Sequence, residues 1–153
     1  MRNTTNSRIR NGSIFMFTVG WFMVAMAIMW IFWTEIFVVS DFLAYTGTTY
    51  AEYLISSPKF AEFWLLTKKL IGIFLLAMGI TIIFITHNGY KKGERWSWYA
   101  LLIAGNVPWW TFIIYKIYIG YYGGSMVVFV IGAILSAVGL AIPAKEFIGK
   151  KSS

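Results

Sequence analysis

The chain has 153 residues, of which 59% are hydrophobic, 20% aromatic and 12% charged, and its formal net charge is +7. Soluble domains carry about 25% charged residues and disordered chains carry few aromatic ones, so this composition excludes both classes and indicates a membrane protein. With no cysteine, the chain cannot form disulfides, thiolate nucleophiles or cysteine-ligated zinc and iron–sulfur centres.

Four segments are apolar enough to cross a bilayer, which takes about 20 residues. The predicted spans are residues 13–33, 70–86, 96–119 and 125–143. The first span has no charged residue and follows three arginines, so we interpret it as an uncleaved anchor and not as a signal peptide. The sequence therefore predicts one all-α domain, residues 1–153, built as an integral membrane bundle of four transmembrane helices.

The segment 34–69 lies between the first two spans and is longer than the other connections. The second helix is predicted to begin inside it, at Pro58, with Ser57 as its N-cap. From Pro58 to Thr86 such a helix is about 43 Å long at 1.5 Å per residue, so its first turns should protrude from the membrane. Within it, the stretch from Ser40 to Ser57 is rich in aromatic residues and poor in charge, which suits contact with a membrane or a partner. Its aromatic residues are Phe42, Tyr45, Tyr50 and Tyr53.

The basic residues predict the orientation of the bundle. Cytoplasmic connections carry an excess of lysine and arginine. If the N-terminus is cytoplasmic, that side holds Arg2, Arg8, Arg10, Lys91, Lys92, Arg95, Lys145, Lys150 and Lys151, whereas the outer side holds Lys59, Lys68, Lys69 and Lys116. We therefore expect a cell-membrane protein with both termini in the cytoplasm and with segment 34–69 outside. The cations flank apolar segments, so the expected partners include membrane lipids and exclude nucleic acid.

The predicted cytoplasmic loop, residues 87–95, combines cations with aromatic side chains. We expect His87, Asn88 and Gly89 to end the second helix, with Asn88 or Gly89 in the left-handed conformation. The residues that follow are interpreted as an anchor for topology and lipid, because cations and tryptophans favour the membrane interface. This anchor consists of Lys91, Lys92, Arg95, Trp96 and Trp98. The alternative is a binding site for a phosphate or a lipid headgroup.

The stretch GERWSWYALL, residues 93–102, resembles a turn found in small four-helix membrane proteins of the DoxX-like kind. The resemblance supports the prediction of four helices and covers little beyond this turn. It implies no activity, and no functional residue is carried over from it.

The third span contains the clearest polar interruption at mid-depth. Pro108 cannot donate a backbone hydrogen bond and is expected to kink the helix, and Asn106 could satisfy the disturbed backbone or reach another helix. One interpretation is a ligand pocket lined by Asn106, Pro108, Trp109 and Trp110. The other is a packing kink with a satisfied amide, which we favour.

Charged residues at the outer surface could form salt bridges. The topology brings Glu35, Lys68, Lys69 and Lys116 to a similar depth, so we expect Glu35 to pair with one of the lysines. Asp41, Glu52 and Glu62 add carboxylates, but without the spacing of a calcium or magnesium loop. The single histidine, His87, is predicted on the opposite side, so no metal or other cofactor is expected. Motifs for nucleophilic or nucleotide chemistry are absent, so no catalytic residue is predicted.

Small residues on two of the spans would let another helix approach closely. They are Gly132, Ser136 and Gly139 on the fourth span, and Gly72 and Gly79 on the second. Such faces fit packing inside the bundle or contact with other integral membrane subunits.

Two functions remain open. The first is a non-catalytic accessory subunit that packs against and stabilises a larger membrane complex, such as a membrane oxidoreductase or monooxygenase. It depends on the uncharged spans and the small-residue faces. The alternative is a free-standing binder or carrier of a hydrophobic small molecule, either a lipid or a quinone.

Overall fold

The computed structural model describes the backbone of residues 2–149 and the side chains of residues 7–149, and within that part it is all-helical. Four helices there are long and apolar enough to cross a membrane, as the sequence predicted. They are α1 (Arg2–Phe32), α4 (Pro58–Asn88), α5 (Arg95–Tyr118) and α6 (Gly124–Ala141). The shorter elements are α2 (Thr34–Thr46), α3 (Tyr50–Ser56), the 3₁₀ turn η1 (Tyr90–Lys92) and α7 (Ala144–Ile148).

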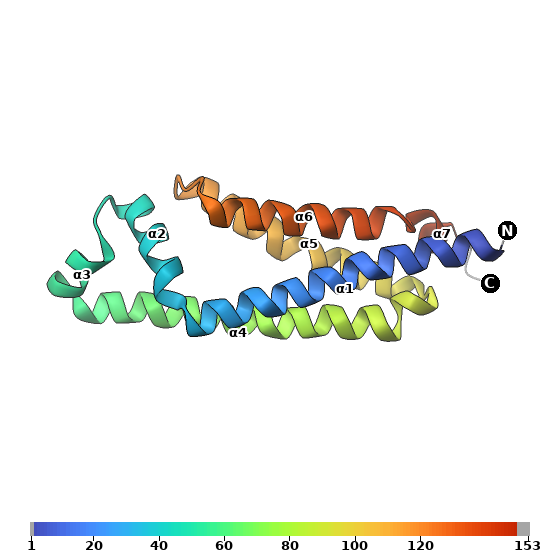
Figure 1. Ribbon diagram of the computed structural model, residues 1–153, viewed down its shortest axis with the longest axis horizontal. Coiled ribbons are helices and arrows are strands. Elements are labelled where there is room, and N and C mark those ends of the chain that lie inside the picture. The colour runs from blue at the N-terminus through green and yellow to red at the C-terminus, as the bar shows by residue number, and fades with distance from the viewer. Residues whose placement is uncertain (1, 150–153) are drawn as a thin grey trace.

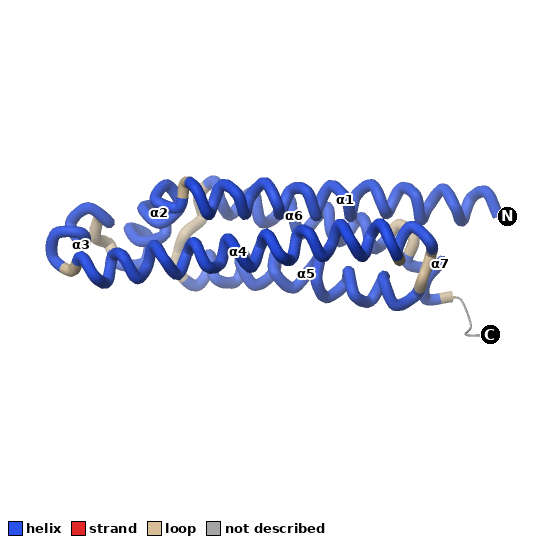
Figure 2. Tube along the Cα trace, turned by 90° about the horizontal axis from the view of Figure 1, so that it is seen from below, coloured by secondary structure: helices blue, strands red, loops and turns tan. Residues whose placement is uncertain are grey.

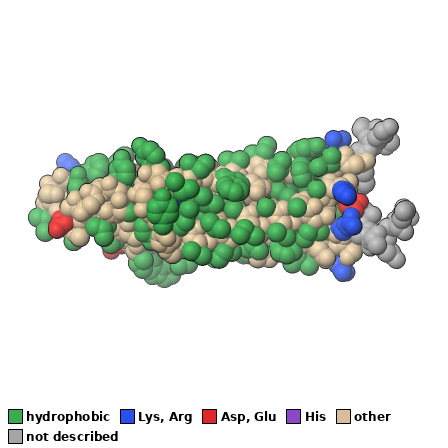
Figure 3. Space-filling model, turned by 90° about the horizontal axis from the view of Figure 1, so that it is seen from above, with side chains coloured by type: hydrophobic (Ala, Val, Ile, Leu, Met, Phe, Trp, Pro, Cys, Tyr) green, Lys and Arg blue, Asp and Glu red, His purple; other side chains and the backbone are tan. Residues whose placement is uncertain are grey.

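The four long helices run side by side along one axis (Figures 1 and 2). α1 packs against α4 along most of its length and against α6 on another side, and α5 packs against α6. The described termini lie together at one end, called the terminal end below, and α2 and α3 lie at the opposite α2–α3 end (Figure 1). Lysine and arginine gather at the terminal end, while hydrophobic side chains cover the middle of the bundle in the view of Figure 3. This distribution fits a bundle with an apolar belt in contact with lipid.

Glycines permit the closest helix contacts inside the bundle. A Cβ atom on Gly79 would lie 2.9 Å from the carbonyl oxygen of Gly20, so α1 and α4 touch through their backbones. A Cβ on Gly72 would lie 3.2 Å from the Cβ of Trp30. On α6, a Cβ on Gly132 would meet the Trp109 ring at 2.6 Å. The small-residue faces predicted from the sequence thus contact neighbouring helices of the same bundle.

The segment between the first two spans folds into two helices over the start of α4. α1 ends at Phe32, and after the bend at Trp33 α2 turns away from the axis of α1 (Figure 1). The side chain of Thr49 accepts a hydrogen bond from the backbone of Glu52, whose carboxylate accepts one from the Thr49 backbone, and this capping box starts α3. Burial, with the nearby Glu35 carboxylate, raises the pKa of Tyr50 above its usual range.

Two of the aromatic residues expected to lie on a membrane or partner are instead buried within the chain. Phe42 and Tyr50 form a second small core with Val38 and Ala61. The Phe42 ring lies 4.8 Å from the Tyr53 ring, and the Tyr50 hydroxyl donates to the carbonyl oxygen of Ala61 at 3.2 Å. This core fixes α2 and α3 to the first turns of α4.

The ends of α4 differ from prediction in two details. Pro58 does occupy the first turn, but the side chain of Ser57 makes no capping hydrogen bond, and its N–H instead donates to Tyr53 at the end of α3. Gly89 is not left-handed: its φ is −117°, and the left-handed residue of the turn is Gly93, at φ 73°. Gly89 is needed for space, because a Cβ there would lie 2.7 Å from the Trp96 ring.

Candidate functional site

Three buried charged residues meet at the α2–α3 end of the bundle. Lys68 on α4 donates to Asp41 Oδ2 on α2 at 2.7 Å, and Lys116 on α5 donates to Asp41 Oδ1. The exposed fractions are only 2% for Asp41, 4% for Lys68 and 2% for Lys116. One carboxylate therefore joins three helices through two ammonium groups. We call these three residues the charge cluster.

Each member of the charge cluster lies on the buried face of its helix. On α2 that face includes Val38, Asp41 and Phe42. On α4 the buried positions after Ala61 continue at helical spacing through Lys68, Gly72, Leu75 and Gly79. On α5, Lys116 follows Trp109 and Ile113 with the same spacing. The bend at Trp33 then brings Asp41 over the two lysines.

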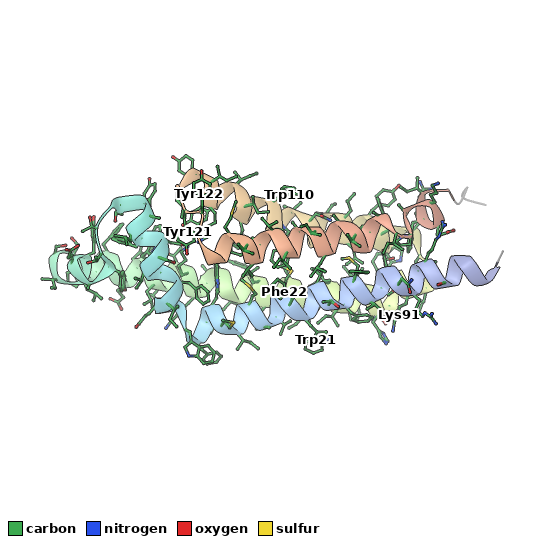
Figure 4. The ribbon with its side chains drawn as sticks, turned by 45° about the horizontal axis from the view of Figure 1, so that its top comes forward. Trp21, Phe22, Lys91, Trp110, Tyr121 and Tyr122 are labelled. Carbon is green, nitrogen blue, oxygen red and sulfur yellow. The ribbon has the colours of Figure 1, made fainter. Side chains whose placement is uncertain are left out.

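Aromatic side chains surround the ammonium groups. The Nζ of Lys68 lies 4.9 Å from the centre of the Tyr115 ring, 5.6 Å from that of Trp30 and 5.7 Å from that of Trp64. It also donates to the Tyr115 hydroxyl at 3.3 Å. Lys116 lies over the ring of Tyr121 at 4.4 Å. Figure 4 shows Tyr121 on the side of its loop that faces α2, whereas Tyr122 points away from the bundle. Aromatic faces attract desolvated cations, which partly offsets the cost of burying them.

The charge cluster has an excess of positive charge and of hydrogen-bond donors. With every group ionised, two ammonium groups face one carboxylate, whose two oxygens are both used. Within the described residues, the buried Nε1 atoms of Trp30 and Trp64 have no hydrogen-bond partner. Buried donors without acceptors cost free energy, as does a buried charge without a counter-ion. The arrangement is therefore suited to accept a group that brings acceptor oxygens.

An apolar groove between α4 and α5 ends at Lys68. Its outer part is a cavity of about 330 Å³ bounded by Trp64, Lys68 and Tyr115, among others. A second cavity of about 410 Å³ continues toward the middle of the bundle. The two cavities share Ile71, Thr111 and Phe112, so they adjoin, and we treat them together as one groove. This α4–α5 groove is an apolar channel, and the buried Lys68 is among the residues at one end of it.

Glu35, expected to pair with an outer lysine, is not the partner found. It is exposed on α2 and makes no ion pair with any side chain in the described part of the chain. Glu35 and Lys69 line one recess at the surface without pairing. Lys68 and Lys116 pair instead with Asp41, which was expected only as an additional carboxylate. The sequence predicted a similar depth for Lys68 and Lys116, but the carboxylate that they share is Asp41 and not Glu35.

The four residues proposed to line a pocket in the third span do not face a common space. Trp109 is 1% exposed and stacks on Phe22 at 5.7 Å, whereas Trp110 is 54% exposed and points away from the bundle (Figure 4). Pro108 lies inside α5 and lines the inner part of the groove. Asn106 is half-buried, and within residues 7–149 its Nδ2 has no partner. The expected satisfied amide is thus wrong as well.

The predicted anchor residues divide into two groups. Lys91, Lys92 and Arg95 are exposed at the terminal end, and Lys91 lies over the ring of Phe17 at 4.8 Å. Trp96 is also exposed. Trp98, however, is buried, and its Nε1 donates to the carbonyl oxygen of Leu140 at 3.1 Å. Trp98 therefore fixes α5 to α6 and does not face lipid.

Comparisons with known proteins do not assign this chain: no family model, curated protein or solved structure matches it. The resemblance of residues 93–102 to a DoxX-like turn stays a prediction. Among the described residues, no group of three or more histidine, aspartate or glutamate side chains could hold a metal ion.

Proposed function

We propose that this protein is a non-catalytic membrane protein that binds a hydrophobic small molecule, a lipid or a quinone, in the α4–α5 groove. The observation that carries the proposal is the end of the groove at Lys68 and Tyr115. Binding sites for small molecules are commonly apolar cavities of about 300 to 1,000 Å³ with a few polar groups that orient the ligand. The groove combines both features.

The helices supply a reason for selective binding at this position. Much of the bundle surface presents apolar side chains to lipid without a polar group nearby. In the groove, an apolar chain can lie against Ile71 and Phe112 with its head beside Lys68. A buried polar contact in a low-dielectric surrounding contributes more than one at an exposed site.

Crosslinking in liposomes tests this proposal. A photoreactive hexadecyl diazirine should label residues of the groove more strongly than other lipid-facing residues. Thr111→Trp places an indole where the two cavities join, so it should reduce this labelling. Ile114→Trp is the matched control, because Ile114 is 64% exposed on the same helix and does not line the groove. Uniform labelling of all lipid-facing residues, unchanged by Thr111→Trp, would contradict the proposal.

An accessory-subunit role is the alternative. The small-residue faces that favoured it are used for packing within this bundle. Gly72, Gly79, Gly132 and Gly139 contact other helices of the same bundle, and Ser136 is fully buried. Purification in mild detergent separates the two roles. Stable co-migration with larger polypeptides would favour the subunit, and a single chain that carries an apolar molecule would favour the binder.

A further inference from the structure

We propose that the ligand of the α4–α5 groove is a long-chain carboxylate, bound with its single negative charge at the charge cluster and its one apolar chain along the groove. This inference rests on the proposed function and adds the chemical class of the ligand. It follows from an unbalanced charge and from unused donors at one end of an apolar channel.

The charge of the cluster selects a monovalent anion. Asp41 neutralises one of the two ammonium groups, and its two oxygens are already bound to Lys68 and Lys116. Both lysines are almost completely buried, so water does not screen the remaining positive charge well. No second carboxylate among the described residues forms an ion pair with them. One negative charge from a ligand would balance the site.

The donors select a head group that accepts several hydrogen bonds. An ammonium group has three N–H donors, and Lys68 uses one on Asp41 and one on Tyr115. The ring of Trp64 lies beside Lys68 and also lines the groove, and its buried Nε1 has no partner in the described part of the chain. A carboxylate brings two acceptor oxygens and the charge together. A quinone brings acceptor oxygens without the charge.

The shape of the groove favours one apolar chain. It is bounded by a single pair of helices, α4 and α5, and Ile71 and Phe112 line both of its parts. Its inner part continues along Leu75 and Met78, away from the charge cluster. A phospholipid also carries one negative charge on its phosphodiester, but its second chain would remain outside the groove. A fatty-acid type of amphiphile uses both ends of the site.

Competition against the hexadecyl diazirine tests this inference. Palmitate should displace the probe from the groove at a concentration at least about tenfold below that of hexadecanol, because a charged hydrogen bond is stronger than a neutral one. Lys68→Met should bring the two concentrations together. This variant leaves Asp41 paired with Lys116, so the fold has a neutral pair to retain. Lys69→Met removes the same charge from a neighbouring residue outside the groove and should preserve the preference.

The outcomes distinguish this inference from the proposed function. Equal displacement by palmitate and hexadecanol in the unmodified protein would overturn the carboxylate and leave the groove as a binding site. A phosphatidylglycerol that displaces the probe better than palmitate would overturn it in favour of a phospholipid. Failure of the probe to label the groove at all would overturn both proposals. If Lys68→Met does not fold, Lys116→Met removes the same charge and leaves the Asp41–Lys68 pair, so a retained preference in that variant would also overturn the carboxylate.

Discussion

Replacing Asp41 with asparagine should destabilise the protein more than the loss of any exposed carboxylate. Asp41 is 2% exposed and is the counter-ion of both buried lysines. Asparagine has nearly the same size, so packing is preserved while the negative charge is lost. Two buried ammonium groups then face each other across α4 and α5 without a carboxylate between them. The variant therefore isolates the electrostatic contribution of Asp41.

The expected cost can be bounded from two directions. Breaking a buried ion pair by removing one partner typically costs about 3 to 5 kcal/mol. A lysine can avoid the unpaired charge by losing its proton, and for an ordinary lysine at pH 7 that costs about 4.6 kcal/mol. The free energy of unfolding should accordingly fall by about 3 to 5 kcal/mol. By contrast, Glu35→Gln removes an exposed carboxylate from the same helix and should change it by no more than about 0.5 kcal/mol.

Unfolding in mixed micelles, driven by increasing sodium dodecyl sulfate, measures these differences. The double variant Asp41→Asn/Lys68→Met should be more stable than Asp41→Asn alone, since only one buried ammonium group remains, and this coupling is the signature of a direct interaction. Hydrogen exchange should show that α2 opens first in Asp41→Asn, because the carboxylate ties α2 to α4 and α5. If Asp41→Asn is no less stable than Glu35→Gln, or if the double variant shows no coupling, the charge cluster does not hold α2 in place.

The remaining predictions concern packing, topology and pH. Gly132→Leu should lower the melting temperature of the isolated protein, because the new Cβ would lie 2.6 Å from the ring of Trp109. Gly124→Leu is the control, since the space around Gly124 is open and the melting temperature should not change. Equal melting temperatures for the two variants would contradict packing of Gly132 inside the bundle. A cysteine introduced at the exposed Ala51 should be labelled from outside the cell, whereas one at the exposed Lys92 should be labelled only after permeabilisation. The reverse pattern would contradict the predicted orientation, with both termini in the cytoplasm. Lys91, Lys92 and Arg95 are the exposed cations between α4 and α5, and each contributes about 1 kcal/mol of attraction to anionic lipid. Replacing all three with glutamine should therefore increase the fraction of inverted protein in the same labelling assay. The pKa of Glu52 is lowered because its carboxylate accepts hydrogen bonds from the backbone and from the hydroxyl of Thr49, the N-cap residue of α3. The contribution of Glu52 to the stability of α3 is therefore present above its unfolded-state pKa and is lost as the pH falls through its folded-state pKa. Hydrogen exchange of α3 should show this loss, and Glu52→Gln should remove the pH dependence.

The four spans could be predicted because their signal is compositional. A run of about 20 apolar residues has few stable alternatives to a membrane helix, and Pro58 marks the start of α4 by its chemistry alone. The helices α2 and α3 were missed for the opposite reason. Their residues are mixed in character, and their burial depends on the surface of α4 that they cover. Local composition does not contain that information.

The charge cluster was not predicted because the rotation of each helix about its axis decides which charged side chains are buried. Lys68 and Lys69 are adjacent, yet one lies on the buried face of α4 with Gly72 and the other lies on the surface. The same difference of about 100° separates Trp109 from Trp110 on α5. The helical spacing of the small and apolar residues contained a usable signal for both pairs. Asp41 could not be paired in this way, since its position depends on the bend at Trp33 and on the helix that follows.

The charge cluster ties α2 to both α4 and α5, but Asp41 balances the charge of only one of the two lysines. A single ammonium group would already satisfy the charge of Asp41 and would tie α2 to one of the long helices. The second adds the cost of another buried cation without another carboxylate. Among the described side chains, that cost is offset only by the aromatic rings around Lys68 and Lys116 and by the hydrogen bond from Lys68 to the Tyr115 hydroxyl. The surplus positive charge lies where an apolar groove ends. An anionic amphiphile from the membrane would pair with this charge, which would offset the free energy of burying it and favour binding.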